Sequence, residues 1–126
     1  MNPIFIESMN KIFTNKFVIE TTEGQSFIRF PSKSPYFGDI EIYEDALNMY
    51  IVVVGKFTHA HFDVYEGSDD EKISEAMNDV IRFLEYLFTD QVICWGSHEG
   101  GGGYSLTEHY EDDGWGDLYV WSGLLK

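Results

Sequence analysis

A histidine-rich run at residues 59–63 contains the side chains best suited to chemistry. Alternate residues of a β-strand project from the same face, so a strand here presents His59, His61 and Asp63 together. Two imidazoles about 7 Å apart are close enough to share a metal ion, and His and Asp are common zinc ligands. One hypothesis is therefore a metal- or small-ligand-binding enzyme that uses this strand face. The alternative is a half-exposed polar face that binds nothing.

The same run resembles the H-x-H-x-D segment of the metallo-β-lactamase family. The family motif continues with a histidine where this chain has Val64, and the chain is too short for the family fold. The resemblance therefore assigns no metal ligands, and we expect no cofactor. Under the enzyme hypothesis, His98 or His109 would be a further group available to the site.

A glycine-rich loop from Gly96 to Gly103 is the second candidate. Backbone N–H groups of such loops can cradle phosphates, but a phosphate-binding loop ends in a Lys-Ser or Lys-Thr pair that opens a helix. No lysine follows Lys72 until the last residue. By residue type, His98 and Glu99 could act as a general acid and a general base. Their adjacent positions in a loop do not define the geometry that such catalysis requires. Cys94 lies in an apolar run, which predicts a buried, inert thiol beside a flexible loop.

Acidic and aromatic residues interleave near the C-terminus, which is the third candidate. Aromatic anchors surrounded by charge are typical of protein–protein interfaces. The alternative is an acidic turn whose aromatic side chains belong to the core. The predicted partner-binding residues are Glu108, Glu111, Asp112, Asp113, Trp115, Asp117, Tyr119 and Trp121.

The net charge of −14 is distributed unevenly along the chain. Residues 1–34 carry three acids and four bases, a net charge of +1. Residues 35–82 carry eleven acids and three bases, and residues 83–126 carry eight acids and one base. Such a surface repels nucleic acid and anionic membranes and attracts a basic protein. We therefore expect a basic protein partner, and neither nucleic acid nor a membrane.

One long amphipathic helix is predicted from Ser68 to Thr89. Its first residues fit a capping box, in which Ser68 and Glu71 satisfy each other's backbone N–H groups. Acids in the first turn suit the positive end of the helix dipole. Apolar residues then recur at three- and four-residue steps to form one stripe, namely Ile73, Ala76, Met77, Val80, Leu84, Leu87 and Phe88.

Short apolar or alternating runs predict strands in most of the remaining chain. Asn2-Pro3 predicts a short N-terminal helix, because proline suits the first helical position. The β-branched run from Met49 to Val54 predicts a central strand covered on both faces. Together these features predict a single α+β domain over residues 1–126, with a mostly antiparallel sheet of about six strands and the long helix on one face. The strand-like runs are 17–20, 26–30, 38–43, 49–54, 59–65, 91–95 and 116–121.

Composition and size favour a cytoplasmic protein. The single Cys94 excludes an internal disulfide, no apolar run approaches the roughly 20 residues that span a bilayer, and no secretory signal pattern begins the chain. A small acidic α+β domain without a recognisable catalytic set resembles the immunity proteins that bacteria make against their own toxins. The resemblance rests on size, charge and aromatic–acidic clustering, so it assigns no residues. It implies a non-enzymatic inhibitor that neutralises a basic partner such as a toxin domain.

A structural homo-oligomeric subunit is the remaining alternative. It would pair with a second copy through an exposed sheet edge, since edge strands carry unpaired backbone groups. We therefore keep a homodimer as an alternative state.

Overall fold

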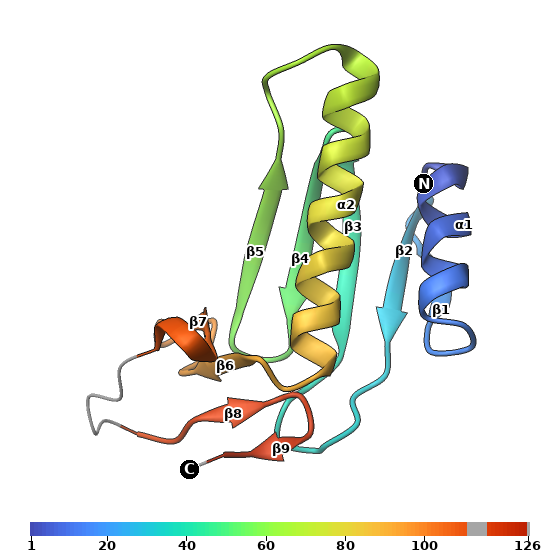
Figure 1. The fold of residues 1–126 in the computed structure, drawn as a ribbon. Helices are drawn as coiled ribbons and strands as arrows, with labels where there is room; N and C mark the ends of the chain where they lie inside the picture. Colours follow the sequence, from blue (N-terminus) through green and yellow to red (C-terminus); the bar gives the residue numbers. More distant parts are fainter. Residues whose placement is uncertain (111–115, 126) are drawn as a thin grey trace.

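Two antiparallel sheets and two α-helices make up the structure, a computed structural model that describes residues 1–110 and 116–125 (Figure 1). The α+β class, the antiparallel pairing and both predicted helices are confirmed. The prediction of a single sheet of about six strands differs from the structure, in which the described residues form sheets of five and four strands.

The five-stranded sheet contains the first five strands in chain order, so each strand pairs with the next. Its first connection is the two-residue turn Glu23-Gly24, where φ is 54° and 80°. Positive φ at both positions is the backbone shape that closes a two-residue hairpin without splaying its strands. The strands are β1 (Val18–Thr22), β2 (Gln25–Phe30), β3 (Ile40–Ala46), β4 (Met49–Val54) and β5 (Thr58–Asp63).

The four-stranded sheet follows the long helix and has the order β7-β6-β8-β9. The strand at residues 92–95 matches the predicted run 91–95. The predicted last strand, 116–121, is shorter in the structure, where only Tyr119 and Val120 form a strand before the chain turns back. A 3-10 turn, η1 (Thr107–His109), follows β7. The strands are β6 (Val92–Trp95), β7 (Gly103–Leu106), β8 (Tyr119–Val120) and β9 (Gly123–Leu124).

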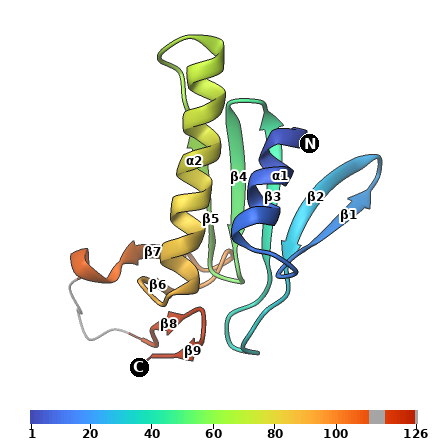
Figure 2. The same ribbon diagram turned by 45° about the vertical axis from the view of Figure 1, so that its right-hand side comes forward.

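The helices α1 (Pro3–Ile12) and α2 (Asp69–Phe88) cover the same face of the five-stranded sheet (Figure 2). The predicted capping box of α2 is present, because Glu71 N–H donates to Ser68 Oγ at 3.2 Å and Ser68 N–H donates to the Glu71 carboxylate. Neither described α-helix has the length and apolarity that crossing a bilayer requires.

The core lies between the two helices and the strand residues that face them. Burial alternates along β4, where Tyr50, Val52 and Val54 are fully buried and the residues between them are half-exposed. The prediction that this strand is covered on both faces was therefore wrong. An antiparallel strand needs no crossover helix on its second face, so neither helix covers that face.

A buried tyrosine attaches α1 to the sheet. The Tyr50 hydroxyl donates to Glu44 Oε2 at 3.1 Å, and the same oxygen accepts from the Asn2 N–H at 3.0 Å. The Phe5 ring centre lies 4.7 Å from that of Tyr50. Burial, and then the neighbouring Glu44 carboxylate, raise the pKa of Tyr50 far above its usual range, so the phenol stays protonated.

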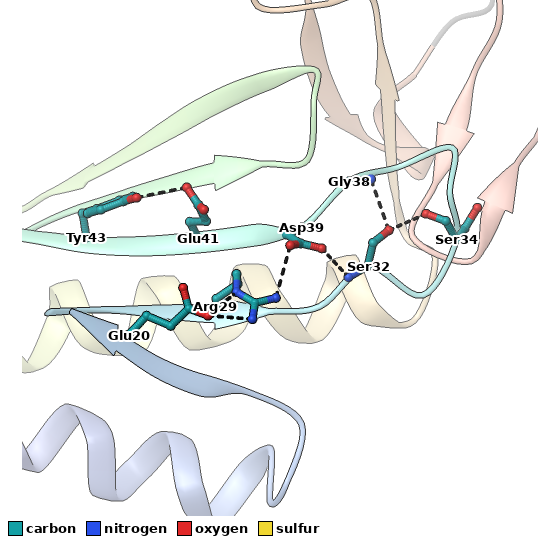
Figure 3. Close-up of polar contacts among 8 residues, drawn as sticks. All are labelled: Glu20, Arg29, Ser32, Ser34, Gly38, Asp39, Glu41 and Tyr43. Atoms are coloured by element: carbon teal, nitrogen blue, oxygen red, sulfur yellow. Dashed lines mark hydrogen bonds and ion pairs between the residues drawn. The ribbon is translucent and has the colours of Figure 1, made fainter. Parts of the chain in front are cut away.

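Polar contacts fix the connection between β2 and β3 (Figure 3). Arg29 pairs with Glu20 at 2.6 Å and with Asp39 at 3.3 Å. Asp39 also accepts from the Ser32 N–H at 2.6 Å, and Ser32 Oγ accepts from the Gly38 N–H at 3.2 Å. These bonds hold both ends of a nine-residue connection, and thereby position the exposed residues between them.

Removing the N-terminal cap of α2 tests the predicted role of the capping box. Ser68→Ala should lower the free energy of unfolding by about 1 kcal/mol, because the Glu71 N–H loses its acceptor. Urea denaturation measures the change.

The matched control is Ser74→Ala, which makes the same substitution at an exposed position inside α2. Alanine has the higher helix propensity, so this variant should be unchanged or slightly more stable. Equal losses in the two variants would contradict the role of the capping box.

Candidate functional site

The C-terminal aromatic–acidic surface is built around Tyr119. Its ring centre lies 5.1 Å from that of Phe57 and 6.5 Å from that of Tyr36. Its hydroxyl donates to Asp117 Oδ2 at 3.3 Å, and the Lys56 ammonium lies 5.7 Å from the ring centre. We call Tyr36, Tyr119 and Asp117 the tyrosine platform. The two tyrosine rings are stacked with an interplanar angle of 29°, and Tyr119 also packs against Phe57.

Tyr36 is a member of the platform that the sequence did not reveal. It is 51% exposed and lies in the β2–β3 connection, 83 positions before Tyr119. Tyr36 directly follows the polar, proline-containing stretch from Pro31 to Pro35, and only the fold brings it beside Tyr119 of β8. No spacing in the sequence signals this contact.

The other predicted partner-binding residues occupy different environments. Glu108 is exposed in η1, with its carboxylate 3.4 Å from His109 Nε2. Trp121 is 7% exposed and packs against Phe37 and Phe88, with ring centres 5.5 Å and 5.0 Å away. Trp121 thus lies in the core, and we leave it out of the proposed surface. Glu111, Asp112, Asp113 and Trp115 lie outside the described residues.

The chain around η1 is attached to the second sheet by aromatic packing. The ring centres of Tyr110 and Trp95 are 5.5 Å apart. Both residues contact a small hydrophobic cluster formed by Ile93, Leu118 and Val120. This packing holds η1, and with it the exposed Glu108, against the second sheet.

Three exposed histidines gather at the edge of the five-stranded sheet. His59 and His61 project from β5 with ring centres 5.0 Å apart, and His98 stacks parallel to His59 at 6.0 Å. The Asp63 carboxylate accepts from the Tyr65 hydroxyl at 3.1 Å. Within residues 1–110 and 116–125, no group of three or more His, Cys, Asp or Glu side chains is arranged to hold a metal ion. The described geometry therefore does not favour the metal hypothesis.

The glycine-rich loop is a closely packed connection between β6 and β7. A Cβ at Gly96, where φ is 76°, would lie 2.3 Å from the Gly101 carbonyl oxygen. A Cβ at Gly102 would lie 2.2 Å from the Phe57 carbonyl oxygen, and one at Gly103 would meet the Trp95 ring at 2.8 Å. Glycine is thus required by close packing. A strand, not a helix, follows the loop, so it is not a phosphate-binding loop of the predicted kind.

Cys94 is fully buried in β6, as the sequence predicts. Burial raises the pKa of its thiol from 9.0 to about 12. Because the thiolate is the nucleophilic form, this cysteine is protonated and inert at neutral pH.

Comparison of the chain with protein-family models, curated proteins and solved structures finds no match in any of the three. The function must therefore be inferred from the chemistry of the surface.

The burial of Cys94 predicts a pH dependence of stability. With a folded pKa near 12 and an unfolded pKa near 9.0, the unfolded state releases its proton first as pH rises. The stabilising contribution is complete below about pH 9 and is lost between pH 9 and pH 12. Cys94→Ala removes this contribution. Urea denaturation should show that the wild type loses about 1 kcal/mol more than the variant between pH 8 and pH 10.

The cavity left by Cys94→Ala lowers stability at every pH, so only the difference in slope is informative. Parallel pH profiles would show that the thiol is not held protonated by the fold.

Proposed function

We propose that this protein is a non-enzymatic binding protein that engages a basic partner protein through its acidic surface. The carrying observation is the tyrosine platform, where two stacked rings stand beside the exposed Asp117 carboxylate. A basic toxin domain is the partner class that the resemblance to immunity proteins implies. Inhibition of that partner would follow if the complex covers its active surface.

The charge that supports this proposal is largely unneutralised. Among the described residues, ion pairs with lysine or arginine involve only Lys11, Arg29, Lys72 and Arg82. Exposed carboxylates such as Asp70, Glu75 and Glu85 have no cationic partner within the described chain. Cationic side chains of a partner would pair with these carboxylates and accelerate the encounter.

The platform supplies the contacts that would keep the partner bound. Tyrosine offers a large amphipathic surface with few rotatable bonds, and tyrosines are enriched at interface hot spots. Packing against Phe57 already restricts the Tyr119 ring, so binding costs little additional side-chain entropy. Long-range charge therefore sets the association rate, and the tyrosines set the lifetime of the complex.

A homodimer through β1 is the second candidate, and one observation favours it. β1 is an edge strand, and its Val18 and Ile19 side chains are 43% and 48% exposed. A second copy pairing along this edge would satisfy the free backbone groups. Analytical ultracentrifugation should then show a dimer that Ile19→Lys disrupts; a monomer at all concentrations would rule this candidate out.

The leading proposal is tested by affinity capture from the source cells at low and high salt. We expect one basic protein whose retention falls as salt rises, because exposed charges are screened. The variant Tyr36→Ala/Asp117→Asn should weaken that capture at least tenfold, since it removes a ring and a charge of the platform.

The matched control is Tyr65→Ala/Asp70→Asn, which removes the same residue types at exposed positions near the start of α2. Both double variants change the net charge equally, so a general field effect would weaken both. Equal weakening, or capture that salt does not affect, would remove the platform as the binding surface.

A further inference from the structure

The C-terminal ends of α1, β2 and α2 lie near the second sheet (Figure 2). A groove is lined by residues at these ends. Its volume is about 490 Å³, within the range that holds small organic ligands. The residues that line it are far apart in the sequence, and the fold brings them together. The lining residues are Ile12, Phe13, Lys16, Phe30, Pro31, Lys33, Phe88 and Trp121.

Four aromatic rings form the floor of the groove. The Phe88 ring centre lies 4.8 Å from that of Phe30, 5.0 Å from that of Trp121 and 5.5 Å from that of Phe13. Phe13, Phe30 and Trp121 are each less than 10% exposed, so packing holds these rings in place. Ile12 at the rim is 48% exposed. The groove therefore offers a preformed apolar surface.

Lys16 and Lys33 give this groove a positive rim in an acidic protein. Both are exposed, and neither makes an ion pair or a cation–π contact within the described chain. The other described lysine and arginine side chains are all engaged, since Lys11, Arg29, Lys72 and Arg82 pair with carboxylates and Lys56 lies over the Tyr119 ring. No acidic residue lines the groove.

We propose that this groove binds a small amphipathic organic anion. Its ring or chain lies on the four aromatic residues, and its carboxylate or other anionic group lies at the rim with Lys16 and Lys33. The C-terminal ends of α1 and α2 carry partial negative charge, which places the anionic group at the lysines rather than at the floor. This inference concerns a surface separate from the tyrosine platform and does not depend on the proposed function.

The size and charge of the groove favour a small ligand over a protein. A standard protein interface covers about 800 Å² of each partner, which is far more than eight lining residues provide. A basic protein, the partner expected elsewhere on this molecule, is repelled by two unpaired lysines. Charge complementarity therefore selects an anion with one compact apolar group.

The probe for the test is 8-anilinonaphthalene-1-sulfonate, an aromatic anion, with the uncharged N-phenyl-1-naphthylamine as its analogue. The full chain should bind the anion with a stoichiometry of one by isothermal titration calorimetry. Lys16→Gln/Lys33→Gln should weaken that binding at least tenfold and leave binding of the uncharged analogue within twofold. Binding to the folded state should also raise the melting temperature.

The control variant is Lys11→Gln/Lys72→Gln, which removes the same charge from lysines that lie outside the groove. It should bind the anion as the wild type does. Absence of binding at 1 mM anion, equal weakening in both double variants, or unchanged affinity in Lys16→Gln/Lys33→Gln would each overturn the proposal. Near-UV circular dichroism confirms that every variant is folded, because the anion also binds partly unfolded proteins.

Discussion

Aromatic packing at the C-terminal end of α2 joins the parts of this structure. Phe88 touches Phe13 after α1, Phe30 at the end of β2 and Trp121 beside β8. Five residues earlier, Phe83 lies edge-on to Tyr104 of β7 and 5.3 Å from Phe62 of β5. The helix thus contacts both sheets through two phenylalanines. A short second sheet with strands of two to four residues depends on these contacts, because such strands are too short to be stable alone.

This packing determines which side chains remain on the surface and available for binding. The apolar stripe of α2 is used in the core, so its solvent side keeps the charged residues. Trp121 is also buried in the core, although the acidic and aromatic residues around it in the sequence are typical of an interface. Tyr119, next to the buried Val120, is half-buried: its ring packs on Phe57 of the main core and also meets the exposed Tyr36. The two neighbours in β8 therefore contact different hydrophobic clusters, Tyr119 the main core and Val120 the small cluster with Ile93 and Leu118.

Structural features that depend on residues close together in the sequence were predicted correctly. The capping box of Ser68 and Glu71 and the proline at the start of α1 each act within a few residues, so their positions could be predicted directly. Of the second sheet, β6 was predicted and the predicted strand 116–121 overlaps the shorter β8. The strands β7 and β9 were not predicted, because Gly103–Leu106 begins inside a glycine-rich run and β9 is too short for an alternating pattern. The β6–β7 hairpin depends on close packing of glycines against the chain around Phe57.

The candidate sites depend on contacts between distant parts of the chain. The sequence indicated Asp117 and Tyr119 by their acidic and aromatic types, but not Tyr36, which the β2–β3 connection brings to them. Lys16 and Lys33 are ordinary surface lysines in the sequence. They become a distinct feature only when the ends of α1 and β2 lie beside α2.

Hydrogen–deuterium exchange of the captured complex tests the central claim most directly, because it maps the surface that the partner covers. We predict slower exchange in the β2–β3 connection around Tyr36 and in the chain from Asp117 to Val120, with little change on the solvent side of α2. Protection confined to α2, or no protection at either segment of the tyrosine platform, would contradict binding through this surface.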